Sequence, residues 1–224
     1  MSLYKNKAKF YDKFMEKIGK DYEKEVGTIL PYLKEKKSVL ELGSGTGNFA
    51  KVLLDNYFEV ICSDVSLEML SIAKEKGINC KKIDMRSFSL DKKVDVILSL
   101  FNTLMYNKNE IELKKNISSC KNNLNTGGKL IIEVNNPERL LQTDKHVYSV
   151  EIEPNVYITQ IDLREGVKLF HHFIFIDLSS NELAIDTHET TIFASERIIS
   201  ILKEFFKSVE ILDKGNHRYF IATV

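Results

Sequence analysis

The glycine-rich segment at residues 39–50 constrains the fold more than any other stretch of this chain. It reads Val-Leu-Glu-Leu-Gly-Ser-Gly-Thr-Gly-Asn-Phe-Ala. The residues before the glycines fit a strand buried on both faces, and the apolar residues after them recur at helical spacing: Phe49, Val52 and Leu53. Glycine takes positive φ and lets the backbone approach a ligand closely. The segment therefore predicts a strand, a tight turn against a ligand, and a helix.

The residues around the turn indicate which charge this ligand carries. Gly43, Gly45 and Gly47 are spaced Gly-x-Gly-x-Gly, whereas a dinucleotide fingerprint is Gly-x-Gly-x-x-Gly and a P-loop continues with Gly-Lys-Ser/Thr. Glu41 lies two residues before the first glycine, where its carboxylate disfavours an anion and favours a cation. S-adenosylmethionine carries an ammonium and a sulfonium. We therefore expect Glu41 and the turn, including Ser44, to bind this cofactor; a plain tight turn is the alternative.

A second acidic residue follows the next predicted strand. Residues 58–62 are predicted as a strand that ends in Ser63 and Asp64, and Asp64 lies 17 residues after Gly47. In the dinucleotide-binding fold, an acid at this place binds ribose hydroxyls with two acceptor oxygens. We expect Asp64 to bind the cofactor ribose, and a role in helix capping is the alternative.

The remaining periodicity predicts an α/β protein with an insertion. Helical patterns alternate with a short predicted strand at 79–83 and with further predicted strands at 94–100 and 129–134, which favours a Rossmann-like sheet of seven strands. After the fifth strand the pattern becomes β-like, with runs at 156–163, 167–178 and 183–193, before a helix at 195–206 and two last strands at 208–212 and 218–224. We expect a cofactor-binding domain of residues 1–134 and 194–224, and an antiparallel subdomain of residues 135–193. This subdomain would wall the acceptor pocket, mediate a homodimer, or do both.

The composition of the chain argues against nucleic acid, a membrane and a metal as binding partners. The chain of 224 residues has 32 basic and 32 acidic residues, so it lacks the electrostatic footprint of a nucleic-acid-binding protein. No apolar run has the length of a membrane span and no signal peptide is recognisable, which favours a cytoplasmic protein. Three widely spaced cysteines predict neither a disulfide framework nor a zinc site, and we assign no metal ligands.

The whole pattern resembles class I S-adenosylmethionine-dependent methyltransferases. In that family an acid after the third strand accepts from the adenine amino group and an apolar neighbour covers the ring, roles that fall to Asp84 and Met85 here. A helical lid ahead of the glycine turn closes over the cofactor, which places Tyr22 of the segment at 4–36 at the site. Leu100, which ends the fourth strand, is also expected to contact the cofactor.

A narrower resemblance is to the N,N-dimethyltransferases that act on TDP-linked amino sugars. It rests on Tyr-Asp at 11–12, Lys-Asp-Tyr at 20–22, Asp-Met-Arg at 84–86, Arg-Glu-Gly at 164–166 and Asn-His-Arg-Tyr-Phe at 216–220. The resemblance implies that Arg218 helps to hold a nucleotide sugar. One departure is clear, because those enzymes carry paired tryptophans after the fifth strand, whereas this chain has Asn135 and Asn136 and no tryptophan.

Methyl transfer mainly requires a placed acceptor and excluded water, since the methyl group is already activated. A tyrosine or histidine can orient an amine by a hydrogen bond. Tyr11 in the lid and Tyr106 after the fourth strand are the catalytic candidates; the resemblance implies tyrosine or histidine at the position of Tyr106. Adjacent His171 and His172 must point to opposite faces of a strand, and we expect His172 to contact the substrate.

Three alternatives stay open beside a small-molecule methyltransferase. An enzyme that methylates tRNA or protein predicts a basic patch, which the mixed charges do not suggest. A non-enzymatic binding module would be expected to lose one of Glu41, Asp64 or Asp84, and all three are present. A nicotinamide dehydrogenase is disfavoured by the glycine spacing and by Glu41.

Overall fold

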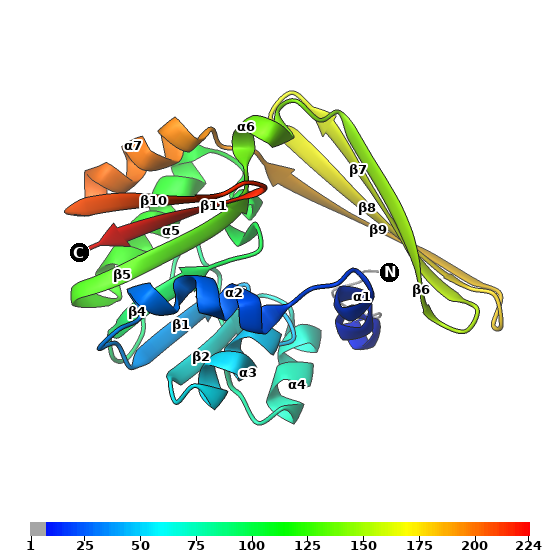
Figure 1. Ribbon diagram of the computed structural model, residues 1–224, viewed down its shortest axis with the longest axis horizontal. Coiled ribbons are helices and arrows are strands. Elements are labelled where there is room, and N and C mark those ends of the chain that lie inside the picture. The colour runs from blue at the N-terminus through cyan, green and yellow to red at the C-terminus, as the bar shows by residue number, and fades with distance from the viewer. Residues whose placement is uncertain (1–7) are drawn as a thin grey trace.

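The computed structural model describes residues 8–224, and a seven-stranded sheet forms its core (Figure 1). The strands lie in the order β10-β11-β5-β4-β1-β2-β3, and β11 alone runs antiparallel to the others. The alternating first part of the chain comprises β1 (Ser38–Leu42), α3 (Asn48–Asp55), β2 (Glu59–Asp64), α4 (Leu67–Glu75), β3 (Asn79–Lys82), β4 (Val94–Ser99), η3 (Thr103–Tyr106), α5 (Glu110–Asn122) and β5 (Leu124–Asn135). This confirms the predicted Rossmann-like fold class.

The inserted sheet follows β5 and is antiparallel throughout. After α6 (Pro137–Leu140) it comprises β6 (Lys145–Glu153), β7 (Val156–Glu165), β8 (Lys168–Asp177) and β9 (Glu182–Thr191). The chain then returns to the core as α7 (Ser195–Phe205), β10 (Ser208–Lys214) and β11 (His217–Thr223). The sequence pattern indicated three strands here and missed β6, an edge strand with mostly exposed side chains. The division into two domains at these positions stays a prediction.

Helices cover both faces of the core sheet. On one face α5 and α7 contribute Leu113, Ile117, Ile198 and Leu202 to a buried cluster. On the other face α2 (Tyr22–Ile29) and α3 bury their apolar sides against the strands. Each fully buried aliphatic side chain of this kind stabilises the fold by about 1.5–3 kcal/mol. The core thus fixes the carboxyl ends of the parallel strands, which point toward the inserted sheet (Figure 1).

The N-terminal lid packs on the inserted sheet as well as on the core. It consists of η1 (Ala8–Phe10) and α1 (Tyr11–Lys17), and residues 4–7 of the predicted helical segment lie outside the described residues. The rings of Phe10 and Phe175 are tilted with their centroids 5.0 Å apart, and Phe14 meets Phe173 edge-on with centroids 6.1 Å apart. Figure 1 shows α1 between the core and β6–β9, so the lid bridges the two sheets.

Within residues 8–224, no helix combines the length and the apolarity that crossing a bilayer requires.

Candidate cofactor and acceptor site

A cavity of about 530 Å³ lies where the glycine turn, the lid, the loop after β4 and strand β9 meet. Most of the residues predicted to form the site line it: Tyr11, Tyr22, Gly43, Ser44, Gly45, Asp64, Asp84, Met85 and Tyr106. Residues from the inserted sheet complete the wall: His188, Glu189 and Thr191. One cavity therefore joins the candidate cofactor residues to side chains of the inserted sheet.

Each glycine of the turn has a positive φ, but the three have different neighbours. A Cβ on Gly43 would lie 2.5 Å from Oγ1 of Thr103, and a Cβ on Gly47 would lie 2.7 Å from Cδ1 of Ile78. A Cβ on Gly45 would meet only Cε1 of Tyr11, at 3.9 Å. Packing therefore requires glycine at the first and third positions, whereas the second borders the cavity and leaves room for a ligand.

Glu41 is a buried carboxyl group in β1, 2% exposed, and it is not among the residues that line the cavity. Burial, and then the charge of Asp64, raise the pKa of Glu41 to about 8. Its Oε2 accepts no hydrogen bond from the part of the chain that the structure describes. A buried oxygen without a donor is costly, and a ligand ammonium would satisfy it. This orphaned oxygen fits the amino acid moiety of S-adenosylmethionine.

Asp64 lines the cavity at the end of β2 and also holds the turn in place. Its Oδ2 accepts from the backbone N–H of Gly45 at 3.0 Å, and its Oδ1 accepts from that of Ser66 at 2.9 Å. Burial raises the pKa of Asp64 above its ordinary value. Because a carboxylate offers about four lone-pair sites, two such bonds leave capacity for ribose hydroxyls. The capping and the cofactor roles are therefore compatible.

Asp84 and Met85, which follow β3, line the same cavity, but Asp84 has a partner that the sequence did not indicate. Arg86 donates to both its oxygens, from Nε at 2.8 Å and from Nη2 at 2.6 Å. This fork lowers the pKa of Asp84. The carboxylate is thereby held in one orientation at the cavity rim. The spacing Asp-Met-Arg was the available signal, since residues two apart in a turn can form such a pair.

Three tyrosines from separate elements meet around the cavity. Burial raises the pKa of Tyr22 to about 12 and raises the pKa of Tyr11 well above 10.0. Both phenols are therefore protonated at neutral pH and can donate hydrogen bonds. Tyr106 ends η3 and borders the cavity with 38% of its surface exposed. Its ring lies 6.3 Å from that of His188, nearly perpendicular to it.

Leu100 is placed in the core rather than in the cavity. It is 3% exposed, and the next residue, Phe101, lines the cavity instead. Phe101 and Asn102 both have left-handed backbone conformations, with φ of 53° and 64°. The buried carboxylate of Glu133 accepts from the N–H of Phe101 at 2.5 Å and holds this turn. The positive φ values turn the chain so that Phe101, not Leu100, faces the site.

Arg218 is not brought to the cavity either. Its guanidinium is bound by Glu138 and Asp213, each at 2.5 Å, and by the hydroxyl of Ser195. These partners come from α6, β10 and α7. Arg218 therefore links α6, the helix that precedes the inserted sheet, to elements of the core. Both acids that flank it satisfy its charge.

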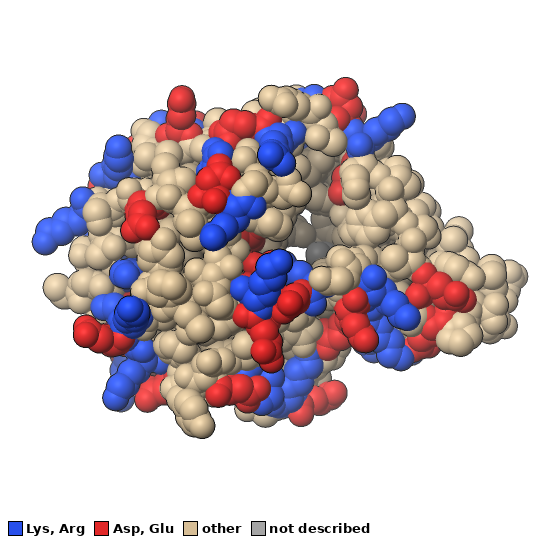
Figure 2. Space-filling model, in the orientation of Figure 1, with Lys and Arg blue, Asp and Glu red and all other residues tan. Residues whose placement is uncertain are grey.

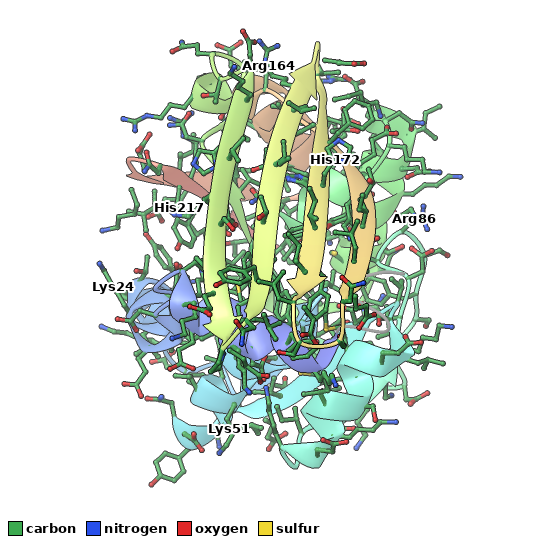
Figure 3. The ribbon with its side chains drawn as sticks, turned by 90° about the vertical axis from the view of Figure 1, so that its right-hand side faces the viewer. Lys24, Lys51, Arg86, Arg164, His172 and His217 are labelled. Carbon is green, nitrogen blue, oxygen red and sulfur yellow. The ribbon has the colours of Figure 1, made fainter. Side chains whose placement is uncertain are left out.

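His172 points away from the cavity because of the strand register. His171 pairs with His188 across β8 and β9, so these two share the inner face, and His172 shares the outer face with Thr187, to which it bonds at 2.9 Å. Figure 3 looks onto this outer side of the sheet and labels His172 there. The prediction that adjacent histidines point to opposite faces is confirmed, but the histidine at the cavity is His188, from the next strand.

A polar cluster that sequence reasoning missed fastens the lid to the turn. Asp12 of α1 accepts from the hydroxyl of Thr46, from Nδ2 of Asn48 at 2.9 Å and from Nζ of Lys76 at 2.7 Å. These donors come from the glycine turn, the start of α3 and the end of α4. The lid is thus positioned by an ion pair and two hydrogen bonds beside the cavity.

Comparison with known proteins agrees with this geometry. Residues 39–128 match the family described as "Methyltransferase domain". The matched segment runs from β1 into β5 and contains the glycine turn, Asp64 and Asp84. This match supports the methyltransferase class and the S-adenosylmethionine cofactor that were predicted from the glycine turn and its acids.

The similar proteins include sugar methyltransferases. The chain is 28% identical over 132 residues to a dTDP-3-amino-3,4,6-trideoxy-alpha-D-glucopyranose N,N-dimethyltransferase of Streptomyces venezuelae, a match that spans 56% of each protein. The crystal structure of Streptomyces venezuelae DesVI superimposes with a TM-score of 0.84 at 24% identity, over 97% of this chain and 98% of that one. CalS10 with bound S-adenosylmethionine, an amino pentose methyltransferase from Micromonospora echinaspora, gives a TM-score of 0.81 at 18% identity, over 95% of each chain. The match to the curated relative thus covers little more than half of that protein's length, whereas the superposition on DesVI covers nearly all of both chains.

Proposed function

We propose that this protein transfers a methyl group from S-adenosylmethionine to an amine of a small molecule, of the nucleotide-linked amino sugar class. The observation that carries the proposal is the single cavity shared by the glycine turn and by β9 of the inserted sheet. A cavity of about 530 Å³ suits a small ligand beside a cofactor. The naming of one relative as a dTDP-amino-sugar N,N-dimethyltransferase supports the choice of amine.

Separate residues bind the cofactor and the acceptor. The orphaned carboxyl oxygen of Glu41 takes the cofactor ammonium, Asp64 takes the ribose hydroxyls, and Met85 covers the adenine. The bound cofactor supplies an activated methyl group on a sulfonium. Tyr11 and Tyr106 hold the acceptor nitrogen by hydrogen bonds, and the lid and inserted sheet exclude water. In the face that Figure 2 shows, basic and acidic side chains are intermixed, which favours such an acceptor over a polyanion.

We also propose a homodimer through the outer face of the inserted sheet. That face presents exposed apolar side chains from three strands, including Val147 at 58%, Leu183 at 64% and Ile185 at 54% exposure. An antiparallel sheet with one face packed normally carries polar residues on the other. Exposed apolar side chains on a face that is normally polar are typical of an association surface.

The test is calorimetric titration with S-adenosylhomocysteine, with NAD as the control ligand. We expect binding of S-adenosylhomocysteine alone, and a loss of about 1–3 kcal/mol of affinity in Asp64→Ala, since the ribose hydroxyls lose a charged acceptor. Turnover is then assayed by mass spectrometry with dTDP-3-amino-3,6-dideoxyglucose. Binding of NAD alone would refute the cofactor assignment, and cofactor binding without methylation of any amino sugar would refute the acceptor class.

A further inference from the structure

The loop after β4 has a backbone conformation that needs support from its surroundings. Phe101 and Asn102 have φ of 53° and 64°, both in the left-handed region. Asparagine tolerates this region, whereas a phenylalanine there is strained and persists only where its neighbours impose it. Strain of this kind is concentrated at functional sites, and Phe101 lines the cavity together with the glycine turn. The groups that impose the conformation of Phe101 therefore bear on ligand binding.

Glu133 of β5 holds the backbone of Phe101 from the core. This carboxylate is 1% exposed, and its Oε2 accepts from the N–H of Phe101 at 2.5 Å. Its Oε1 lies 2.7 Å from Nδ1 of His217, the first residue of β11, which Figure 3 labels. Burying a carboxylate costs free energy, and the two bonds that offset this cost join the loop after β4 to β11.

The ring of Phe101 meets two other rings that line the cavity. It lies edge-on to Tyr22 of α2, with centroids 5.9 Å apart, and close to edge-on to Phe49 of α3, with centroids 5.8 Å apart. Nζ of Lys20 lies 3.9 Å from the centroid of the Phe101 ring, and Glu25 of α2 pairs with this ammonium at 2.8 Å. The backbone of Phe101 is thus fixed from β5, and its ring contacts α2 and α3. A change in the loop after β4 would therefore alter the shape of the cavity.

We propose that Glu133, supported by His217, is a positioning residue for the cofactor: it holds Phe101 in the left-handed conformation that presents the ring to S-adenosylmethionine. This inference rests on the proposed function, which places the cofactor in this cavity. Glu133 is not among the residues that line the cavity, so it acts on binding through the N–H of Phe101. Removal of its carboxylate takes away the acceptor of that N–H, and the strained conformation is then no longer favoured.

The charges around His217 strengthen its bond with Glu133. From β5, the hydrogen bond to Glu133 raises the pKa of His217 above its ordinary 6.5, against the effect of burial. From α2, Glu25 also raises this pKa, whereas Lys20, which precedes α2, lowers it. His217 therefore keeps its positive charge to a higher pH than a free histidine does, and a charged donor makes a stronger hydrogen bond to a carboxylate.

A first experiment needs no ligand. The chain has no tryptophan, so Phe101→Trp introduces a single indole as a fluorescent reporter at the site. In this background we expect Glu133→Leu to move the emission to longer wavelength, because the indole leaves its aromatic neighbours for water. Glu133→Gln keeps a carbonyl oxygen for the same N–H and should restore most of the original emission. An emission that Glu133→Leu leaves unchanged would overturn the inference.

The matched control is Asp95→Ala, near the other end of β4. Asp95 accepts from the hydroxyl of Ser38 at 3.0 Å and from Nδ2 of Asn125 at 2.9 Å, so its loss should lower stability without moving the emission. His217→Ala serves as a second variant if Glu133→Leu does not fold, because the side chain of His217 is 39% exposed. It removes the partner of Oε1 and should move the emission in the same direction by a smaller amount. Unchanged emission in His217→Ala would then overturn the inference.

A second experiment uses calorimetry with S-adenosylhomocysteine to ask whether Glu133 acts through Phe101. Glu133→Leu and Phe101→Leu should each weaken binding about 5- to 10-fold. Because both changes remove the same ring contact, the double variant should bind no more than about 10-fold more weakly than wild type. Independent effects would multiply to about 25- to 100-fold and would overturn the inference. Asp95→Ala should bind as the wild type does.

Failure of the proposed function has a different outcome. A wild-type protein that does not bind S-adenosylhomocysteine would refute the cofactor assignment. The emission of the ligand-free Phe101→Trp protein would still decide whether Glu133 positions this residue.

Discussion

Replacing Gly47 by alanine separates backbone strain from crowding in the glycine turn. Gly47 has a φ of +76°, and an added Cβ would lie 2.7 Å from Cδ1 of Ile78 and 3.1 Å from both Cβ of Ala73 and Sγ of Cys62. The left-handed conformation costs an alanine about 1–2 kcal/mol, and overpacking a core adds about 1–3 kcal/mol. We therefore expect Gly47→Ala to lower the free energy of unfolding by about 2–5 kcal/mol.

The matched control is Gly77→Ala. Gly77 has nearly the same φ, +79°, but an added Cβ would meet nothing within 4 Å, so only the strain of about 1–2 kcal/mol applies. Urea titration of both variants gives the free energy of unfolding. In thermal unfolding, the midpoint should fall by about 2–4 °C for each kcal/mol that a protein of this length loses. Equal losses for the two variants, within about 0.5 kcal/mol, would refute the argument that Gly47 is required by its neighbours. Gly45→Ala should resemble Gly77→Ala in stability and differ from it by weaker binding of S-adenosylhomocysteine, because its Cβ borders the cavity.

Three further predictions follow from single side chains. Because burial raises the pKa of Glu41 from 4.5 to about 8, the unfolded chain releases this proton first, and stability should fall as pH rises from 4.5 to 8, by at most about 5 kcal/mol. Urea unfolding across this range should show a flatter dependence in Glu41→Gln, and equal slopes would contradict the shift. Asp12→Ala removes the acceptor that joins the lid to the turn, and it should weaken the binding of S-adenosylhomocysteine, measured by calorimetry, about 5- to 10-fold. The control is Glu16→Ala on the exposed side of the same helix, which should leave this affinity unchanged. Ile185→Glu, at a residue that is 54% exposed, should convert the proposed dimer to a monomer in light scattering. The control Ile111→Glu, at a residue of α5 that is 68% exposed, should leave the dimer intact, and a wild-type monomer would refute the dimer.

The sequence by itself determined the fold class and the centre of the site. The strand, glycine turn and helix at residues 38–55 follow from local patterns of apolar residues and glycine. Glu41 was assigned from its place beside the glycine turn, Asp64 from its place after the second strand, and Asp84 from the resemblance to methyltransferases. Of these acids, Asp64 and Asp84 do line one cavity, and Glu41 lies buried in β1 with an unsatisfied oxygen. The strand, turn and helix could be predicted because each depends on neighbours in the chain, and the cofactor roles of the three acids stay predictions.

The tertiary structure alone decided which side chains from the inserted sheet and from the C-terminal strands reach that cavity. His171, His172 and His188 all sit in β-like patterns, and a shift of register by one residue exchanges the two faces of a strand, so only the pairing of β8 with β9 selects His188. Arg218 looks like a free cation in the sequence, but Glu138 and Asp213 approach it from other elements and satisfy its charge. The left-handed turn that exposes Phe101 in place of Leu100 depends on Glu133, 32 residues away. Contacts between residues distant in the chain carry no local signal, and for that physical reason the acceptor half of the site became visible only in the folded molecule.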